Sequence, residues 1–148
     1  MPNQNYRVVL DTNEVVGAGT GWLDHGIPVP DGNLHRRILI RVAESHTGLY
    51  SGKIVGEYLE KLVDLGYSRE RALKMITYLM GAFSQVTIVS TSAPVPPADP
   101  DDEVVLLCAI DGNADYLVSE DRHLTDIRGS YTKPVIGRSS ELAAPLGA

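Results

Sequence analysis

The fold is decided by the stretch Arg7-Val8-Val9-Leu10-Asp11-Thr12-Asn13, close to the N-terminus. A short apolar run rich in β-branched residues predicts a buried strand of a parallel sheet. The run ends in a carboxylate, a hydroxyl and an amide, and the carboxyl ends of strands are where open α/β sheets build their ligand sites. Burying a carboxylate there is costly unless a cation or hydrogen-bond donors compensate it. Asp11 is therefore either a metal ligand or the first residue of a tightly hydrogen-bonded turn.

Length and composition restrict the class of protein. The chain has 148 residues, a net charge of −6 and one cysteine, Cys108, and we expect a single domain over residues 1–148. One cysteine excludes an internal disulfide and a cysteine-rich zinc site. No apolar run approaches the roughly 20 residues of a membrane span, and Met1–Asn5 lacks the layout of a signal peptide. We therefore expect a cytoplasmic protein with no membrane attachment.

The negative charge argues against a chain that binds nucleic acid through a large basic surface. It does not exclude an enzyme whose acids are gathered at a metal centre, because bound divalent ions reverse the local field.

Predicted strands and helices alternate along the chain. After the first strand, strands are expected over residues 48–51, 86–89, 115–119 and 133–136, and the main helices over 34–44, 52–65, 68–83 and 99–112. Asp31 or Asn33 would cap the first of these helices. In the third, the spacing predicts an inner side made of Ala72, Leu73, Ile76, Leu79, Met80 and Phe83. The alternation predicts a single-domain, three-layer α/β/α fold with a mostly parallel sheet.

Acidic residues follow several of the predicted strands. Asp11 ends the first strand, Asp121 follows the 115–119 strand, the cluster Asp101-Asp102-Glu103 begins a helix, and Glu57 lies about two turns into another. Parallel strands share their carboxyl edge, so we expect these acids to converge in one cleft, where mutual repulsion would raise their pKa values. Mg²⁺ or Mn²⁺ suits a site of carboxylates and water. Such ions generate hydroxide from water and stabilise in-line displacement at phosphorus.

Three further polar residues would support this site without binding the ion. Thr12 and Asn13 would orient the first ligand, and Ser51 precedes the helix that carries Glu57. Ordinary structural roles remain open for each residue taken alone: Ser51 as a helix cap, Glu57 as a surface acid, and Asp101 to Glu103 as capping residues. The histidines have no ligand-like spacing and are expected to be structural or on the surface; they include His35, His46 and His123.

Taken in order, four motifs resemble the PIN-domain family, and most closely its branch of toxins from bacterial and archaeal toxin–antitoxin pairs. They are Leu10-Asp11-Thr12-Asn13, Ser51 with Glu57, Asp99-Pro100-Asp101-Asp102, and Ala114-Asp115-Tyr116-Leu117-Val118-Ser119-Glu120-Asp121. The resemblance implies a metal-dependent endoribonuclease that hydrolyses RNA phosphodiester bonds. It implies that Asp11, Glu57, one acid of the Asp101-Asp102-Glu103 cluster and Asp121 surround Mg²⁺ or Mn²⁺. It also implies a homodimer inhibited by a small antitoxin protein.

The third motif leaves its register open. Asp102 is the first choice because it matches the second acid of the family's Asp-Pro-Asp-Asp, whereas Glu103 suits an alignment on the apolar residues that follow.

Two departures from the family keep an alternative open. Position 14, usually aliphatic in this family, is Glu14, and the Gly- and Pro-rich loop from Gly19 to Asp31 is unusually long. The alternative is a catalytically weak PIN-like module that binds RNA or protein. A flavodoxin-like phosphoacceptor domain is disfavoured, because its last strand would end in a Lys, whereas Lys133 begins the strand here.

Overall fold

An all-parallel sheet of five strands forms the centre of the computed structural model, which describes residues 4–19 and 33–148. The strands are β1 (Arg7–Leu10), β2 (Thr47–Tyr50), β3 (Ser84–Gln85), β4 (Tyr116–Val118) and β5 (Val135–Gly137). Their order across the sheet is β3-β2-β1-β4-β5. The predicted α/β fold is confirmed. The order differs from the 2-1-3-4-5 order of flavodoxin-like sheets, which removes the phosphoacceptor alternative.

Helices connect the strands in succession. α1 (Thr12–Gly19) and α3 (Leu34–Ser45) lie between β1 and β2, and α4 (Gly52–Asp64) and α5 (Arg69–Ala82) lie between β2 and β3. α6 (Pro100–Asp111) leads to β4, α7 (Arg122–Thr125) and a 3₁₀ turn (Arg128–Ser130) lead to β5, and α8 (Ser139–Leu146) follows. None of the helices in the described ranges has the length and apolar character that crossing a membrane requires.

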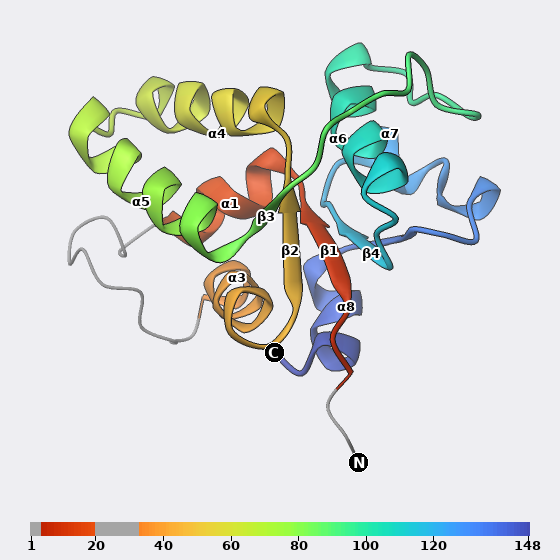
Figure 1. Ribbon diagram of the computed structural model, residues 1–148, viewed down its shortest axis with the longest axis horizontal. Helices are drawn as coiled ribbons and strands as arrows, with labels where there is room; N and C mark the ends of the chain where they lie inside the picture. Colours follow the sequence, from red (N-terminus) through yellow and green to blue (C-terminus); the bar gives the residue numbers. More distant parts are fainter. Residues whose placement is uncertain (1–3, 20–32) are drawn as a thin grey trace.

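The connections place helices on both faces of the sheet. The chain moves from β1 to β2 to β3 in one direction along the sheet, then crosses to β4 and β5 in the other. Right-handed crossovers therefore put α1, α3, α4 and α5 on one face and α6 and α7 on the other. In Figure 1, α1, α3 and α5 gather on one side of β1 and β2, and α6 and α7 on the other. The direction of winding changes between β1 and β4, and such a switch point opens a crevice at the carboxyl edge.

The helix starts follow from local capping chemistry. Side-chain oxygens of Asn33, Ser51, Ser68 and Asp99 each accept a hydrogen bond from a backbone N–H in the first turn of α3, α4, α5 and α6. These contacts satisfy N–H groups that have no partner within the helix. The alternative cap Asp31 and residues 20–31 of the long loop lie outside the described residues.

The edge strand β3 is shorter and earlier than the predicted strand over residues 86–89. Its partner β2 ends at Tyr50, because Ser51 already caps α4. Val86 N–H donates one more bond to the Tyr50 carbonyl at 2.7 Å. Beyond it the Asp111 carboxylate accepts bonds from the backbone N–H groups of Val89 and Ser90. The Asp111 side chain therefore accepts the hydrogen bonds that a neighbouring strand would otherwise accept. For this reason residues 86–89 do not form the predicted strand.

The buried face of α5 also differs from the prediction. Ala72, Met75, Ile76 and Leu79 are buried, whereas Leu73 and Met80 are each 44% exposed. The buried set follows the i, i+3, i+4, i+7 spacing of one helical stripe, and both exposed residues come one position after a member of it. Counting Leu73 and Met80 as core was wrong, because the apolar residues of this helix are more numerous than its buried face can hold.

Candidate metal centre

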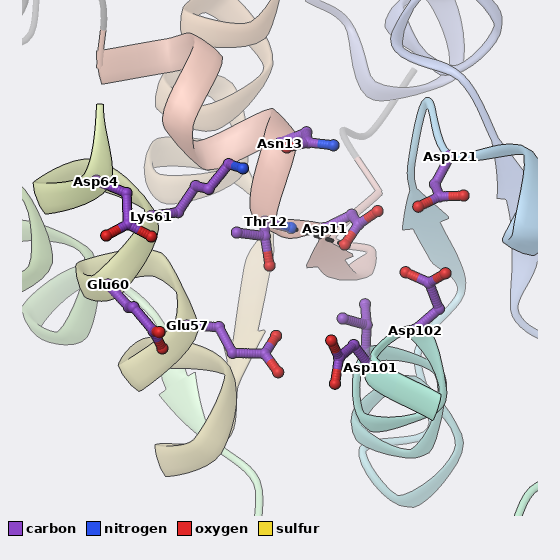
Figure 2. A pocket seen from close by; sticks show the side chains of 11 residues that line it. Asp11, Thr12, Asn13, Glu57, Glu60, Lys61, Asp64, Asp101, Asp102 and Asp121 are labelled. Carbon is purple, nitrogen blue, oxygen red and sulfur yellow. Dashed lines mark hydrogen bonds between the residues drawn. The ribbon is translucent and has the colours of Figure 1, made fainter. Parts of the chain in front are cut away.

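An acidic cavity of about 360 Å³ opens at the carboxyl edge of the sheet, at the switch point between β1 and β4. It is lined by Asp11 between β1 and α1, by residues of α1, α4 and α6, and by Asp121 at the start of α7, so the four predicted segments meet there (Figure 2). The lining residues are Asp11, Thr12, Asn13, Glu57, Glu60, Lys61, Asp64, Asp101, Asp102, Val105 and Asp121.

Asp11 is the most tightly held of these acids. Its backbone N–H continues the β1–β4 ladder by donating to the Val118 carbonyl at 2.9 Å. Its side chain is almost wholly buried, and each carboxylate oxygen accepts one hydrogen bond. Oδ1 accepts from the backbone N–H of Thr12 at 2.7 Å, and Oδ2 accepts from the Ser119 hydroxyl at 2.6 Å. These contacts fix the carboxylate at the floor of the cavity.

Asp102 and Asp121 face the same point from α6 and from the start of α7. One oxygen from each of Asp11, Asp102 and Asp121 lies within 4.8 Å of the others. His123 stands beside the pair, with Nδ1 3.2 Å from Asp102 Oδ2 and 3.3 Å from Asp121 Oδ1. Oxygen donors on three separate segments, brought this close, form a set that suits a hard divalent cation. The donor chemistry therefore fits Mg²⁺ or Mn²⁺.

The electrostatics of the cavity reflect crowded negative charge. Burial and the nearby charges of Asp121 and Asp11 raise the pKa of Asp102 to about 7. Burial also raises the pKa of Asp11, and Asp121 adds to the effect, although hydrogen bonds from Ser119 and Thr12 oppose it. A cation at this point would reverse these shifts.

Glu57 extends the cluster from the opposite wall. It lies on α4 and points across the cavity toward Asp11 and Asp101 (Figure 2). Its pKa is raised, first by burial and then by repulsion from Asp101 and Asp11. Lys61, one turn further along α4, brings a positive charge to the same lining. The cavity thus combines a group of acids with a cation and with the amide of Asn13.

Two residues of the predicted set do not reach the cavity. Glu103 turns toward the preceding connection, where its Oε2 accepts a hydrogen bond from the Ala93 backbone N–H at 3.1 Å. Ser51 is buried, caps α4 through Ile54 N–H, and lines a separate cavity beside Val86. Of the acids at the start of α6, Asp101 and Asp102 line the acidic cavity and Glu103 does not.

Sequence reasoning missed two residues of this site. Ser119 is fully buried and links two acids, because its hydroxyl donates to Asp11 and accepts from the Asp121 backbone N–H at 3.0 Å. His123 is exposed, which agrees with the expectation of a structural or surface residue, but its contacts with Asp102 and Asp121 were not predicted. The available signal was the pattern Ser119-x-Asp121-x-His123 directly after a buried strand.

The comparisons with known proteins agree with this arrangement. A family model described as PIN domain matches residues 7–123, which include every acid of the cavity. No curated protein and no solved structure matches the chain.

Proposed function

The chain belongs to the PIN-domain family, whose members are typically metal-dependent nucleases, and we propose that it is a Mg²⁺- or Mn²⁺-dependent endoribonuclease. The observation that carries the proposal is the convergence of Asp11, Asp102 and Asp121, each offering one oxygen within 4.8 Å of the others. Glu57 joins them from the far wall. A divalent cation bound by these residues would supply positive charge to the scissile phosphate and make water more acidic.

The residues of the chain then have separate tasks. Hydrogen bonds from Thr12 and Ser119 hold the Asp11 carboxylate in one orientation before any ligand arrives, and such preorganisation is what a metal site needs. Lys61 and Asn13 line the cavity and are suited to bind phosphate oxygens of the RNA backbone. His123 Nδ1 lies 3.2 Å from Asp102 Oδ2 and 3.3 Å from Asp121 Oδ1, so the imidazole is placed to orient these two carboxylates.

The position of Glu14 bears on the alternative of a catalytically weak binding module. That alternative rested partly on a carboxylate beside the metal site. Glu14 does not belong to the lining of the acidic cavity; it is buried and faces His35, with Oε2 2.7 Å from Nδ1. The departure from the aliphatic residue therefore leaves the acids of the cavity undisturbed, which favours the enzyme over the binding module.

We further propose that the enzyme is the toxin of a toxin–antitoxin pair, working in the cytoplasm as a homodimer restrained by a small antitoxin. The support is apolar surface on the hairpin of α4 and α5, which protein partners commonly cover. Its exposed large side chains are Val63, Leu65, Leu73 and Met80. Expression alone should arrest growth of a bacterial host, and the Asp11→Asn variant should not.

The activity is tested with a labelled RNA carrying single-stranded loops. Wild-type protein should cleave it in Mn²⁺ and stop when a chelator is added in excess. A matched DNA of the same sequence distinguishes ribonuclease from general nuclease. Binding of the RNA without cleavage in Mn²⁺ or Mg²⁺ would support the binding module, and the proposal of an enzyme would fail.

A further inference from the structure

A second group of metal-ligating side chains lies outside the acidic cavity. Glu14 on α1, His35 on α3 and Glu120, two residues after β4, each offer one donor atom, and these atoms lie within 4.8 Å of one another. None of the three lines the cavity described above. Their neighbours differ too, because the charges that act on Glu14 are those of His35 and Glu120.

Glu14 is the unusual member of this group. Its side chain is only 1% exposed, and Oε2 lies 2.7 Å from His35 Nδ1. The other oxygen, Oε1, is buried without a hydrogen bond of ordinary geometry in the part of the chain that the structure describes, and the Glu120 carboxyl is the neighbouring acid that acts on Glu14. Leaving a buried carboxylate oxygen unpaired is costly. Two carboxyl groups and an imidazole held this close are stabilised by a shared proton or by a bound cation, so an unpaired buried oxygen among them marks a place where a cation can bind.

Of the other two members, Glu120 is held in place by hydrogen bonds and His35 is partly open to solvent. Ser139 fixes Glu120, whose Oε1 accepts from both the Ser139 backbone N–H, at 2.9 Å, and the Ser139 hydroxyl. His35 is one-third exposed, so an ion can reach the group from solution. The group therefore contains one buried ligand, Glu14, one ligand fixed by hydrogen bonds, Glu120, and one ligand that is accessible from solution, His35.

We propose that Glu14, His35 and Glu120 form a second metal site, which binds a divalent transition-metal ion and is best suited to Zn²⁺. One imidazole with two carboxylates is a donor set that Zn²⁺ commonly takes, with a fourth position left for water, whereas Mg²⁺ prefers oxygen alone. Burial raises the pKa of Glu14 to about 7 in the absence of an ion, and a bound cation would remove that penalty.

Such an ion would be structural. It would join the start of α1, the start of α3 and the segment between β4 and β5, which are distant in sequence. Asp11 precedes α1 and Asp121 follows Glu120, so the ion would brace two of the elements that carry the acidic cavity. The inference stands apart from the nuclease proposal, because a structural ion here requires no catalysis.

The test uses Zn²⁺ in the Asp102→Asn variant. Among the described residues two other groups of metal-ligating side chains both contain Asp102, namely Asp11-Asp102-Asp121 and Asp99-Asp102-His123. This substitution therefore weakens those two groups and leaves the second site intact. Titration against a chromophoric chelator should show one equivalent of Zn²⁺ bound. Bound Co²⁺ should give the stronger visible absorption of a four-coordinate site, and Zn²⁺ should raise the melting temperature.

Matched variants in the same Asp102→Asn background assign the ligands. His35→Gln and Glu14→Gln should each weaken Zn²⁺ binding by more than about a hundredfold. His123→Gln, an exposed histidine elsewhere, and Glu44→Gln, an exposed acid on α3, should leave it unchanged. Circular dichroism checks that each variant is folded. The proposal is overturned if the Asp102→Asn protein binds no Zn²⁺, or if binding survives His35→Gln.

Discussion

Replacing Asp102 with Asn should stabilise the metal-free protein, although it removes a residue of the acidic cavity. Asp102 is buried, and repulsion from Asp121 and Asp11 adds to the cost of its charge. Asn keeps the size and removes the charge. The same substitution should weaken binding of Mn²⁺, so that stability and metal affinity change in opposite directions. A surface acid would alter neither quantity.

The pH dependence follows from the pKa of the Asp102 carboxyl, which is about 7 in the folded protein against an ordinary value of 3.8. Between those values the folded state holds a proton that the unfolded state releases. Stability from this group is therefore complete below pH 3.8 and lost as the pH rises through 7. The loss has an upper limit of about 4 kcal/mol, at 1.36 kcal/mol per pKa unit. Water in the open cleft reduces it to about 2 kcal/mol.

Asn at position 102 also loses a favourable interaction with the α6 dipole, worth about 0.3–1 kcal/mol. The net gain above pH 7 is therefore about 1–2 kcal/mol, or roughly 2–8 °C in melting temperature for a chain of this size.

Thermal melts followed by circular dichroism, with chelator present, measure this gain at pH 8 and at pH 5. Asp102→Asn should melt above wild type at pH 8, and the difference should shrink toward pH 4. The matched control is Asp101→Asn, which removes an exposed acid from the same helical turn and should stabilise much less, because it relieves only the repulsion of Glu57. The reasoning is refuted if Asp102→Asn melts no higher than wild type at pH 8, or if its gain is independent of pH.

Three further predictions concern single contacts. Ser119→Ala should lower Mn²⁺ affinity by about 10–100-fold, because it frees the Asp11 carboxylate. Ser130→Ala, at an exposed serine, should leave the affinity unchanged. Equal Mn²⁺ affinities of the two variants in calorimetric titration would contradict this role of Ser119. Asp102→Asn should weaken Mn²⁺ binding far more than Glu103→Gln, since Glu103 bonds Ala93 instead, and the reverse ranking would assign the ligand to Glu103. Gly48→Ala should lower the free energy of unfolding by about 1–3 kcal/mol, because the added Cβ would lie 2.4 Å from the Phe83 ring. Gly56→Ala, in open space on α4, should raise the free energy of unfolding instead. Urea unfolding measures both values.

The parts of the fold that the sequence predicts are those decided locally. The buried strand β1 follows from a short apolar run, because few other structures bury consecutive β-branched residues. The starts of α3 to α6 follow from capping residues, since Asn, Ser and Asp satisfy the first N–H groups from their own side chains. The order of acids along the chain then predicts which strand ends they follow.

What the sequence does not predict depends on contacts between distant segments. The length of β3 is limited by where β2 ends, and the β-branched residues 86–89 that follow β3 carry no sign of that limit. The hydrogen bond between Ser119 and Asp11 joins residues 108 positions apart. The pairing of Glu14 with His35 likewise needs α1 and α3 to pack against each other. Spacing along one segment holds no information about such pairs.

The claim that Asp11 anchors a catalytic metal centre is tested most directly by the rate of RNA cleavage in Mn²⁺ for the Asp11→Asn protein. Circular dichroism first establishes that the variant is folded. Loss of one ligand should remove several kcal/mol of transition-state stabilisation, which lowers the rate by about a thousandfold or more. A folded Asp11→Asn protein that cleaves RNA at close to the wild-type rate would contradict the account.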